Sequence, residues 1–248
     1  MHRFYLPPGE SKTGPLTLAG REAHHALHVL RVRPGDQVTI LDGAGRELLC
    51  AVENFDRDKL QLAVLETKTI PAPPCSITLL QAVPKGKIIE SIIQKATELG
   101  VARIVPLLTE RVVTDLDEKH AGRKAEKWQQ VAIEAIKQCG TSWLPRVEAP
   151  MTPAEFLERN EAFELPLVAS LQPGAQHSRN FFQKFEAQHG RKPKSACIWI
   201  GPEGDFTPQE VEAIASAGAL PVTLGKLVLR VETAAIYCLS FLNYELAS

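Results

Sequence analysis

The chain has 248 residues, of which 44% are hydrophobic and 23% charged, and its formal net charge is −1. This composition is typical of a globular protein with one large domain or two small ones. The near-neutral charge argues against a protein that coats nucleic acid through bulk electrostatics, although it leaves room for a local basic patch. No apolar run approaches the roughly 18 residues of a membrane helix, and the N-terminus lacks the apolar core of a signal peptide.

The cysteines are odd in number, widely spaced and set in apolar runs. They are Cys50, Cys75, Cys139, Cys197 and Cys238. Such cysteines are typical of buried thiols in a reducing compartment, and their spacing matches neither a disulfide framework nor a zinc site. We therefore expect a cytoplasmic protein without a bound metal ion.

The stretch up to Gly35 is locally basic. It sets Arg3, Lys12, Arg21, Arg31 and Arg33 against Glu10 and Glu22. Two interpretations stay open, because such a stretch is either an ordinary solvated surface or a patch that contacts nucleic acid. His24 and His28 have the i, i+4 spacing that can bind zinc on a helix, but no third ligand accompanies them.

Short strands precede a proline-rich segment at 70–74, where regular structure is interrupted. A helix is predicted near Glu22 to Leu30, followed by strands at Gln37–Leu41, Glu47–Phe55 and Leu60–Leu65. Strands at this spacing are typical of a small β-barrel. We predict a barrel domain over residues 1–70 and a second domain over residues 75–248.

Beyond the prolines, strand patterns and helix patterns alternate. Strands are predicted at 76–83, 104–108, 165–171, 196–200 and 221–224, and helices at 85–99, 118–139 and 232–246. Thr152 and Thr207 each begin a capping box with proline at the next position, which predicts two further helix starts. This alternation predicts an α/β domain with a mostly parallel sheet covered by helices.

Two glycine-containing loops are the most informative segments. Residues 200–206 (IGPEGDF) and 224–234 (LGKLVLRVETA) each lead from an apolar strand into a helix start. Glycine at such a crossing permits positive φ and close approach of a ligand to the backbone. Open α/β sheets bind ligands beyond the carboxyl ends of their strands. The two loops therefore predict one shared ligand pocket.

Together with other stretches, these loops resemble the RsmE family, SPOUT-class methyltransferases that modify uridine N3 in small-subunit ribosomal RNA. The resemblance covers nearly the whole chain and includes residues 3–5 (RFY), 28–31 (HVLR) and 95–101 (KATELGV). Three positions depart from the family pattern. Asp205 replaces a usual glycine, Lys226 replaces a common arginine, and Thr141 stands where the family tends to carry arginine.

The resemblance implies a PUA-like RNA-binding barrel followed by a SPOUT-type α/β domain with a C-terminal trefoil knot. It implies S-adenosylmethionine as cofactor and 16S rRNA or the small ribosomal subunit as partner. It also implies a homodimer through the C-terminal domain. The final predicted helix agrees with a dimer, because apolar residues surround much of it, although burial inside its own domain is an equal alternative on sequence alone.

The predicted site residues fall into three groups. Cofactor binding is assigned to glycines that expose backbone groups and to neighbouring side chains of the same strand ends: Leu171, Ile200, Gly201, Glu203, Gly204, Leu224, Gly225, Leu229, Thr233 and Ala234. Arg230 and Glu232 are the catalytic candidates, for charge stabilisation and substrate orientation. RNA binding is assigned to Arg3, Arg21, Arg31 and Arg33.

Methylation of uridine N3 needs a positioned methyl donor and loss of the N3 proton, and the sequence does not identify the group that takes this proton. Other functions considered are a methyltransferase of the same class acting on another RNA and a non-catalytic RNA-binding dimer. A nucleotide-dependent oxidoreductase is disfavoured, because no Gly-x-Gly-x-x-Gly follows a first strand.

Overall fold

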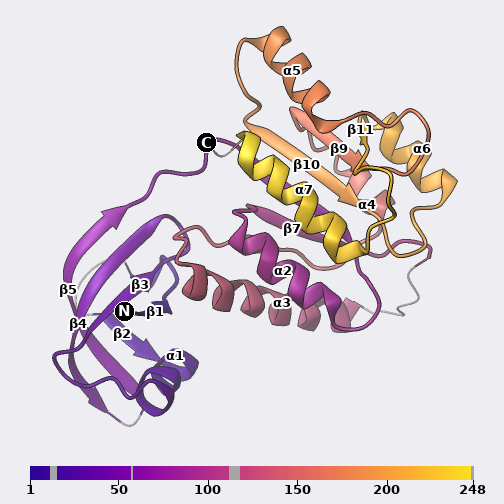
Figure 1. The fold of residues 1–248 in the computed structure, drawn as a ribbon. Coiled ribbons are helices and arrows are strands. Elements are labelled where there is room, and N and C mark those ends of the chain that lie inside the picture. Colours follow the sequence, from indigo (N-terminus) through magenta and orange to yellow (C-terminus); the bar gives the residue numbers. More distant parts are fainter. Residues whose placement is uncertain (12–15, 57, 112–117, 247–248) are drawn as a thin grey trace. The chain divides into compact units, whose positions relative to one another are not determined.

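The computed structural model describes residues 1–11, 16–56, 58–111 and 118–246 (Figure 1). Lys12, counted in the basic N-terminal stretch, and Arg57, in the turn predicted between two strands, lie outside the described residues. The chain divides into two compact units. Unit 1 comprises Met1–Ala72 and Ile133–Leu144, and unit 2 comprises Pro73–Ala132 and Pro145–Ser248.

Unit 1 is a curled five-stranded sheet, a half-barrel with a short helical segment against it (Figure 1). The strand order is β1-β3-β4-β5-β2, with β1 parallel to β3 and the other pairs antiparallel. The strands are β1 (His2–Tyr5), β2 (Leu16–Ala19), β3 (Gln37–Leu41), β4 (Arg46–Asp56) and β5 (Lys59–Thr69). Alternate residues such as Val38, Ile40 and Leu62 are buried, so one sheet face forms the core of this unit.

The predicted helix near Glu22 to Leu30 is two consecutive elements. Helix α1 spans Gly20–His24, and a single wide π turn, η1, spans His25–Val29. The amide of Leu30 donates to the carbonyl of His25 (3.0 Å), which is the i to i+5 bond of a π turn. β5 is also longer than predicted, because its pairing with β4 continues to Thr69 opposite Arg46.

Residues 133–144 belong to unit 1 through several contacts that sequence analysis did not indicate. The Arg3 guanidinium donates to the carbonyls of Lys137 (3.4 Å) and Gln138 (3.2 Å), which end a helix. Trp143 lies so close to Gly45 that a Cβ there would come within 2.6 Å of the indole. The Trp143 indole N–H also donates to the carbonyl of Pro71 (3.1 Å). The segment is therefore built into the half-barrel unit.

Unit 2 is a six-stranded parallel sheet with helices packed on it, as the alternation predicted (Figure 1). The order is β11-β9-β10-β6-β7-β8, and every pair is parallel. The strands are β6 (Ser76–Ala82), β7 (Arg103–Leu107), β8 (Arg146–Val147), β9 (Leu165–Ala169), β10 (Ser195–Ile200) and β11 (Leu220–Val222). Residues 196–200 are all buried, which confirms the strand predicted to be covered on both faces.

The helices of unit 2 largely follow the sequence patterns. They are α2 (Ile88–Glu98), α3 (Glu118–Cys139, whose last turns belong to unit 1), α4 (Pro153–Glu158), α5 (Ser178–His189), α6 (Pro208–Ser216) and α7 (Val231–Leu246). Both capping boxes are present, at Thr152 and Thr207. In Figure 1, α2 and α7 lie side by side across one face of the sheet, and α7 also contacts β10. Phe156 of α4 and Ile214 of α6 pack in a buried cluster with strand residues.

Three boundaries differ from the predictions. α2 starts at Ile88 and not at Lys85, because Gly86 has φ +73° and interrupts the helical backbone before it. β9 ends at Ala169, which leaves Leu171 in the following loop, and β11 is shortened to Leu220–Val222. Helix α5 was not predicted, although three buried phenylalanines and a left-handed Gly190 mark it.

The cysteines are free thiols, and four of them are buried as predicted. Cys139 is the exception: it is exposed, because it is the last residue of α3. Burial raises the pKa of Cys50 and Cys75 to about 11 and that of Cys197 to about 12, which keeps these groups protonated. Within the described residues, no helix has the length and apolarity needed to span a membrane.

Candidate active site

A cavity of about 400 Å³ lies in unit 2 where three neighbouring strands end. Segments after β9, β10 and β11 form its wall, together with the starts of α2 and α7. Because β9, β10 and β11 are adjacent and parallel, their carboxyl ends meet at one edge of the sheet. This arrangement brings the two glycine-containing loops, more than twenty residues apart in the chain, to one pocket.

The loop after β10 is a tight turn whose conformation leaves little room for a side chain at its first position. A Cβ on Gly201 would lie 3.0 Å from Oδ1 of Asp205 and 3.2 Å from the Phe206 ring. Asp205 itself has φ +61°, and its Oδ1 accepts a hydrogen bond from the Phe206 amide (2.8 Å). Aspartate tolerates this left-handed conformation better than most residues do, which explains how it replaces a glycine here.

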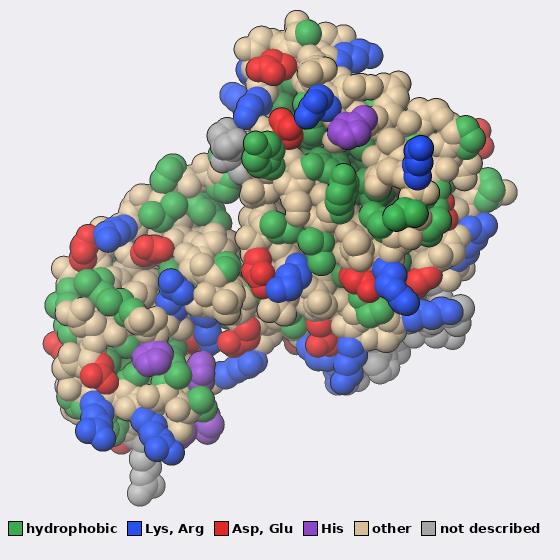
Figure 2. Space-filling model, in the orientation of Figure 1, with side chains coloured by type: hydrophobic (Ala, Val, Ile, Leu, Met, Phe, Trp, Pro, Cys, Tyr) green, Lys and Arg blue, Asp and Glu red, His purple; other side chains and the backbone are tan. Residues whose placement is uncertain are grey.

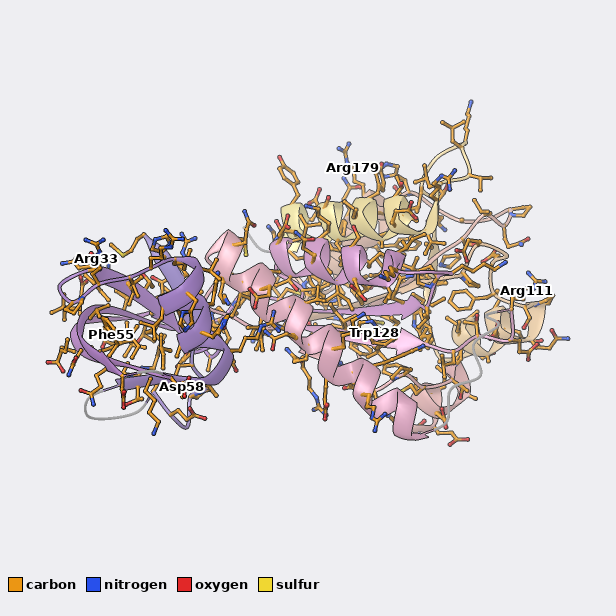
Figure 3. All side chains as sticks on the ribbon, turned by 90° about the horizontal axis from the view of Figure 1, so that it is seen from below. Arg33, Phe55, Asp58, Arg111, Trp128 and Arg179 are labelled. Carbon is orange, nitrogen blue, oxygen red and sulfur yellow. The ribbon has the colours of Figure 1, made fainter. Side chains whose placement is uncertain are left out.

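Arg111 holds this loop from outside the pocket, and sequence analysis did not single it out. Its guanidinium donates to the carbonyl of Gly204 and reaches the carbonyls of Asp205 (3.5 Å) and Phe206 (3.4 Å). Arg111 is labelled in Figure 3, which draws its exposed side chain at the edge of the unit. The adjacent Glu110 amide donates to Glu210 of α6 (3.1 Å). Arg111 lies just after β7, another strand that ends at this edge. That position was the one sequence feature that could have indicated its role.

A second contact joins the loop to the segment before α2. The Glu203 carboxylate accepts a hydrogen bond from the Lys85 amide (3.2 Å). Ile88, at the first position of α2, lines the pocket. The loop after β10 is therefore fixed on two sides, by a guanidinium and by a backbone amide.

The loop after β11 is held differently. Gly225 has φ +107°, and its amide donates to Oγ1 of Thr223 (3.2 Å). A Cβ at Gly225 would meet no atom within 4 Å in the part of the chain that the structure describes, so the requirement for glycine here comes from the backbone angle. Further along, Leu227 and Val228 line the pocket although they are 75% and 79% exposed.

The charges of the pocket wall are mainly acidic. The wall contains one cation, Arg230, and three carboxylates, which are Glu203, Asp205 and Glu232. It therefore carries an excess of two negative charges. Leucines from the loops after β9 and β11 supply apolar surface beside them. Within the described residues, no group of three His, Cys, Asp or Glu side chains is placed to hold a metal ion. Such a pocket suits an organic ligand that carries positive charge and an apolar ring system.

Comparison with known proteins identifies the family. The RNA methyltransferase domain family matches residues 71–243, and the RNA methyltransferase PUA domain family matches residues 18–65. The ribosomal RNA small subunit methyltransferase E of Bacillus subtilis (strain 168) is 33% identical over 232 residues, covering 92% of this chain and 90% of that protein. The chain belongs to the ribosomal RNA small subunit methyltransferase E family. The member from Synechocystis is 32% identical and covers 100% of this chain and 78% of its own length.

Solved structures agree with this family assignment. The methyltransferase E of Neisseria gonorrhoeae, solved bound to S-adenosylmethionine, has a TM-score of 0.84 and 29% identity, and the alignment covers 98% of this chain and 97% of that one. A Legionella pneumophila protein in complex with S-adenosylmethionine has a TM-score of 0.86 and 31% identity, with 98% and 96% covered. The half-barrel and the parallel sheet are thus the fold of this family.

The structure brings together most of the residues predicted for the site. The pocket wall contains Leu171, Ile200, Gly201, Glu203, Leu224, Leu229, Arg230, Glu232 and Ala234. Gly204 and Gly225 lie in the same loops, and Thr233 in the first turn of α7, but none of the three belongs to the wall itself. The wall also contains residues that sequence analysis did not name, among them Ser170 and Val231. Arg230 is exposed directly before α7, and its carbonyl accepts the Ala234 amide (2.9 Å).

The arginines predicted for RNA binding differ in their surroundings. Arg3 is engaged with the end of α3, and Arg21 pairs with Glu134 (3.3 Å). Arg31 and Arg33 are exposed on the loop after η1 and take part in none of the ion pairs found within the described residues. Figure 2 shows Lys, Arg and His side chains together on the visible face of unit 1. Of the four arginines predicted to bind RNA, Arg31 and Arg33 are thus the two that are exposed and form no ion pair with a described residue.

Proposed function

We propose that this protein transfers a methyl group from S-adenosylmethionine to N3 of a uridine in 16S rRNA. The observation that carries the proposal is the pocket at the ends of β9, β10 and β11, to whose wall both family motifs contribute. Relatives named as small-subunit rRNA methyltransferases support the substrate class, and relatives solved with S-adenosylmethionine support the cofactor.

The residues of the pocket fit this cofactor. A volume of about 400 Å³ lies within the usual range for small-ligand sites. The excess of carboxylates suits a cationic sulfonium and an ammonium group, and the leucines suit an adenine ring. When bound, S-adenosylmethionine supplies an electrophilic methyl group. The chain itself contributes positioning and charge, which dominate catalysis of such a displacement.

Arg230 and Glu232 are the proposed catalytic residues, one on each side of Val231 at the start of α7. The N3 proton of the uracil must pass to a base before N3 attacks, so negative charge develops on the uracil; the methyl carbon–sulfur bond would break as the N3–carbon bond forms, and S-adenosylhomocysteine would leave. The Arg230 guanidinium stabilises this charge, and the Glu232 carboxylate orients the base through a hydrogen bond.

Calorimetry and a methylation assay test the proposal together. The purified protein is titrated with S-adenosylmethionine and, as a comparison, with NADH, and is then incubated with 16S rRNA or small subunits. We expect the protein to bind S-adenosylmethionine and not NADH. We also expect one new reverse-transcription stop at a uridine, since a methyl on N3 blocks base pairing. Binding of NADH, or methylation at a base other than uridine, would overturn the proposal.

Unit 1 is the proposed RNA-binding part. We assign residues 1–70, which contain the half-barrel sheet, as a PUA-like barrel. Residues 75–248 are assigned as the methyltransferase domain. The match of residues 18–65 to a PUA domain supports this division. Arg3, Arg21, Arg31 and Arg33 are the proposed RNA contacts. The proposed place of action is the cytoplasm, where rRNA of the small subunit is assembled and used.

The C-terminal domain is further proposed to contain a trefoil knot. β11 pairs with β9 at the sheet edge, whereas α7 packs against α2 and β10. Between Val222 and Val231 the chain therefore crosses the carboxyl ends of β9 and β10. Such a return across the sheet is what threading of the C-terminal segment requires. General topology rules disfavour knots, so the family resemblance carries this proposal.

A homodimer through the same domain is the proposed assembly. The apolar stripe of α7 supports it less than the sequence indicated, because Leu239, Leu242 and Leu246 are buried within their own unit. The support now comes from large side chains that stay exposed beside the pocket and along α7: Leu171, Leu227, Val228, Tyr237 and Tyr244. Light scattering should give about twice the chain mass of 27.2 kDa. A monomer that still methylates RNA would contradict the dimer.

A further inference from the structure

A short basic loop lies at the mouth of the pocket, between β6 and α2. It contains Lys85, Gly86 and Lys87, all exposed. The Glu203 carboxylate accepts the Lys85 amide (3.2 Å), and Ile88, directly after the loop, lines the pocket. Gly86 has φ +73°, which turns the chain between the two lysines. The loop is therefore fixed to the pocket wall by its backbone, while its two ammonium groups form no ion pair with any residue that the structure describes.

Lys85 and Lys87 differ in their ion pairing from several other cations of unit 2. Lys95, Arg103, Lys127 and Arg191 all have carboxylate partners within 4.0 Å. Lys85 and Lys87 take part in none of the ion pairs found within the described residues. The same holds for Lys184 and Lys194 elsewhere on the unit, so the position at the pocket mouth distinguishes the first two.

The charges at the pocket are divided between its wall and its rim. The wall carries the carboxylates Glu203, Asp205 and Glu232, which suit a cationic cofactor. Lys85 and Lys87 stand outside the wall on the adjoining loop. A nucleotide that places its base in the pocket must leave its phosphates outside, where anions meet these lysines. Phosphate contacts of this kind position a nucleic acid without reading its sequence.

We propose that Lys85 and Lys87 bind backbone phosphates of single-stranded RNA next to the nucleotide whose base enters the pocket. The inference rests on the proposed function and adds a second RNA contact, in unit 2, to the one proposed for unit 1. Glu203 acts as a positioning residue for this contact, because its hydrogen bond to Lys85 ties the loop to the cofactor pocket.

A paired charge substitution tests the contact. Lys85→Gln/Lys87→Gln is compared with Lys184→Gln/Lys194→Gln, which removes the same charge from the same unit. The control lysines lie at the opposite end of the sheet, since Lys194 precedes the first residue of β10 and Lys184 lines a hollow with Leu165 and Leu220, where β9 and β11 begin. Binding of a 16S rRNA transcript is measured against KCl concentration with S-adenosylhomocysteine present. S-adenosylmethionine affinity is measured separately.

We expect the slope of log K against log salt to become shallower by about 1.4 in the Lys85/Lys87 variant, since each single-strand phosphate contact contributes roughly 0.7. The affinity for S-adenosylmethionine should stay within twofold, and the control variant should keep the wild-type slope. An unchanged slope in the first variant, or an equal change in the control, overturns the inference. Failure of the wild type to bind S-adenosylmethionine or to methylate the transcript would instead overturn the proposed function.

Discussion

Two glycines of the pocket loops are required for different physical reasons. At Gly201 the space for a Cβ is tight, because Oδ1 of Asp205 and the Phe206 ring lie 3.0 and 3.2 Å from its position. At Gly225 the space is open, but φ is +107°, which strains any residue with a Cβ. The two sites therefore respond differently to substitution, since a clash displaces a neighbouring loop whereas backbone strain acts on the residue itself.

Gly201→Ala should lower affinity for S-adenosylmethionine at least tenfold while the protein stays folded. The new methyl group would push the Asp205 carboxylate and the Phe206 ring outward by a few tenths of an ångström, which distorts the loop after β10 and weakens the Asp205–Phe206 hydrogen bond. Calorimetric titration measures the affinity, and circular dichroism checks the fold. Gly122→Ala in α3 is the matched control, because a Cβ there meets no atom of the described residues within 4 Å. Equal affinities in wild type and Gly201→Ala would remove this loop from the cofactor site.

Arg230→Ala should lower the methylation rate about a hundredfold and the affinity for S-adenosylmethionine by less than threefold. The reason is that a charge-stabilising donor acts mainly in the transition state. Single-turnover methylation and calorimetry give the two quantities, and Arg230→Lys should recover part of the rate because it keeps the charge. A parallel loss of rate and affinity would assign Arg230 to cofactor binding instead.

At the scale of elements, the end of α3 is anchored in unit 1 by a partly buried ion network. Lys137 donates to Glu22 (2.8 Å) and pairs with Glu134 (3.0 Å), and its side chain is only 6% exposed. Glu22 also accepts the amide of Tyr5 in β1 (3.1 Å). One carboxylate thus joins α1, β1 and α3, three elements that are distant in sequence.

Glu22→Ala should destabilise unit 1 by about 2 kcal/mol. It leaves a buried ammonium with a single, more exposed partner and leaves the Tyr5 amide without its acceptor. Urea unfolding, followed by tryptophan fluorescence to which Trp143 contributes the signal of unit 1, measures the change. Glu66→Ala is the control, because its pair with Lys68 is more than half exposed on both sides and should contribute under about 1 kcal/mol. A similar loss in both variants would show that burial does not strengthen the Glu22 contact.

At the scale of the whole molecule, a net charge of −1 coexists with local basic surfaces. Arg31→Gln/Arg33→Gln should weaken binding of 16S rRNA and make its salt dependence shallower by about 1.4 to 1.8, with cofactor affinity unchanged. Filter binding over a range of KCl concentrations measures the slope. Lys59→Gln/Lys68→Gln removes the same charge from unit 1 and should leave the slope alone. No change in the Arg31/Arg33 variant would argue against an RNA contact on this loop.

The amino-acid sequence by itself determined the features that depend on a few neighbouring residues. Thr152 and Thr207 cap helices because their partners are three residues away, and residues 196–200 form a buried strand because all five are apolar. The boundaries of α3 and the positions of the two pocket loops follow in the same way. Helix α5 escaped prediction although its own signals, the phenylalanine spacing and Gly190, are local too.

Only the tertiary structure decided which distant segments meet. Arg111 contacts a loop more than ninety residues away, and residues 133–144 pack into unit 1 although most of α3 belongs to unit 2. β11 pairs with β9 and not with β10. This pairing places the loop after β11 against the loops after β9 and β10. The physical reason is that such contacts depend on chain closure and on mutual packing of whole elements, which no pattern of neighbouring residues encodes.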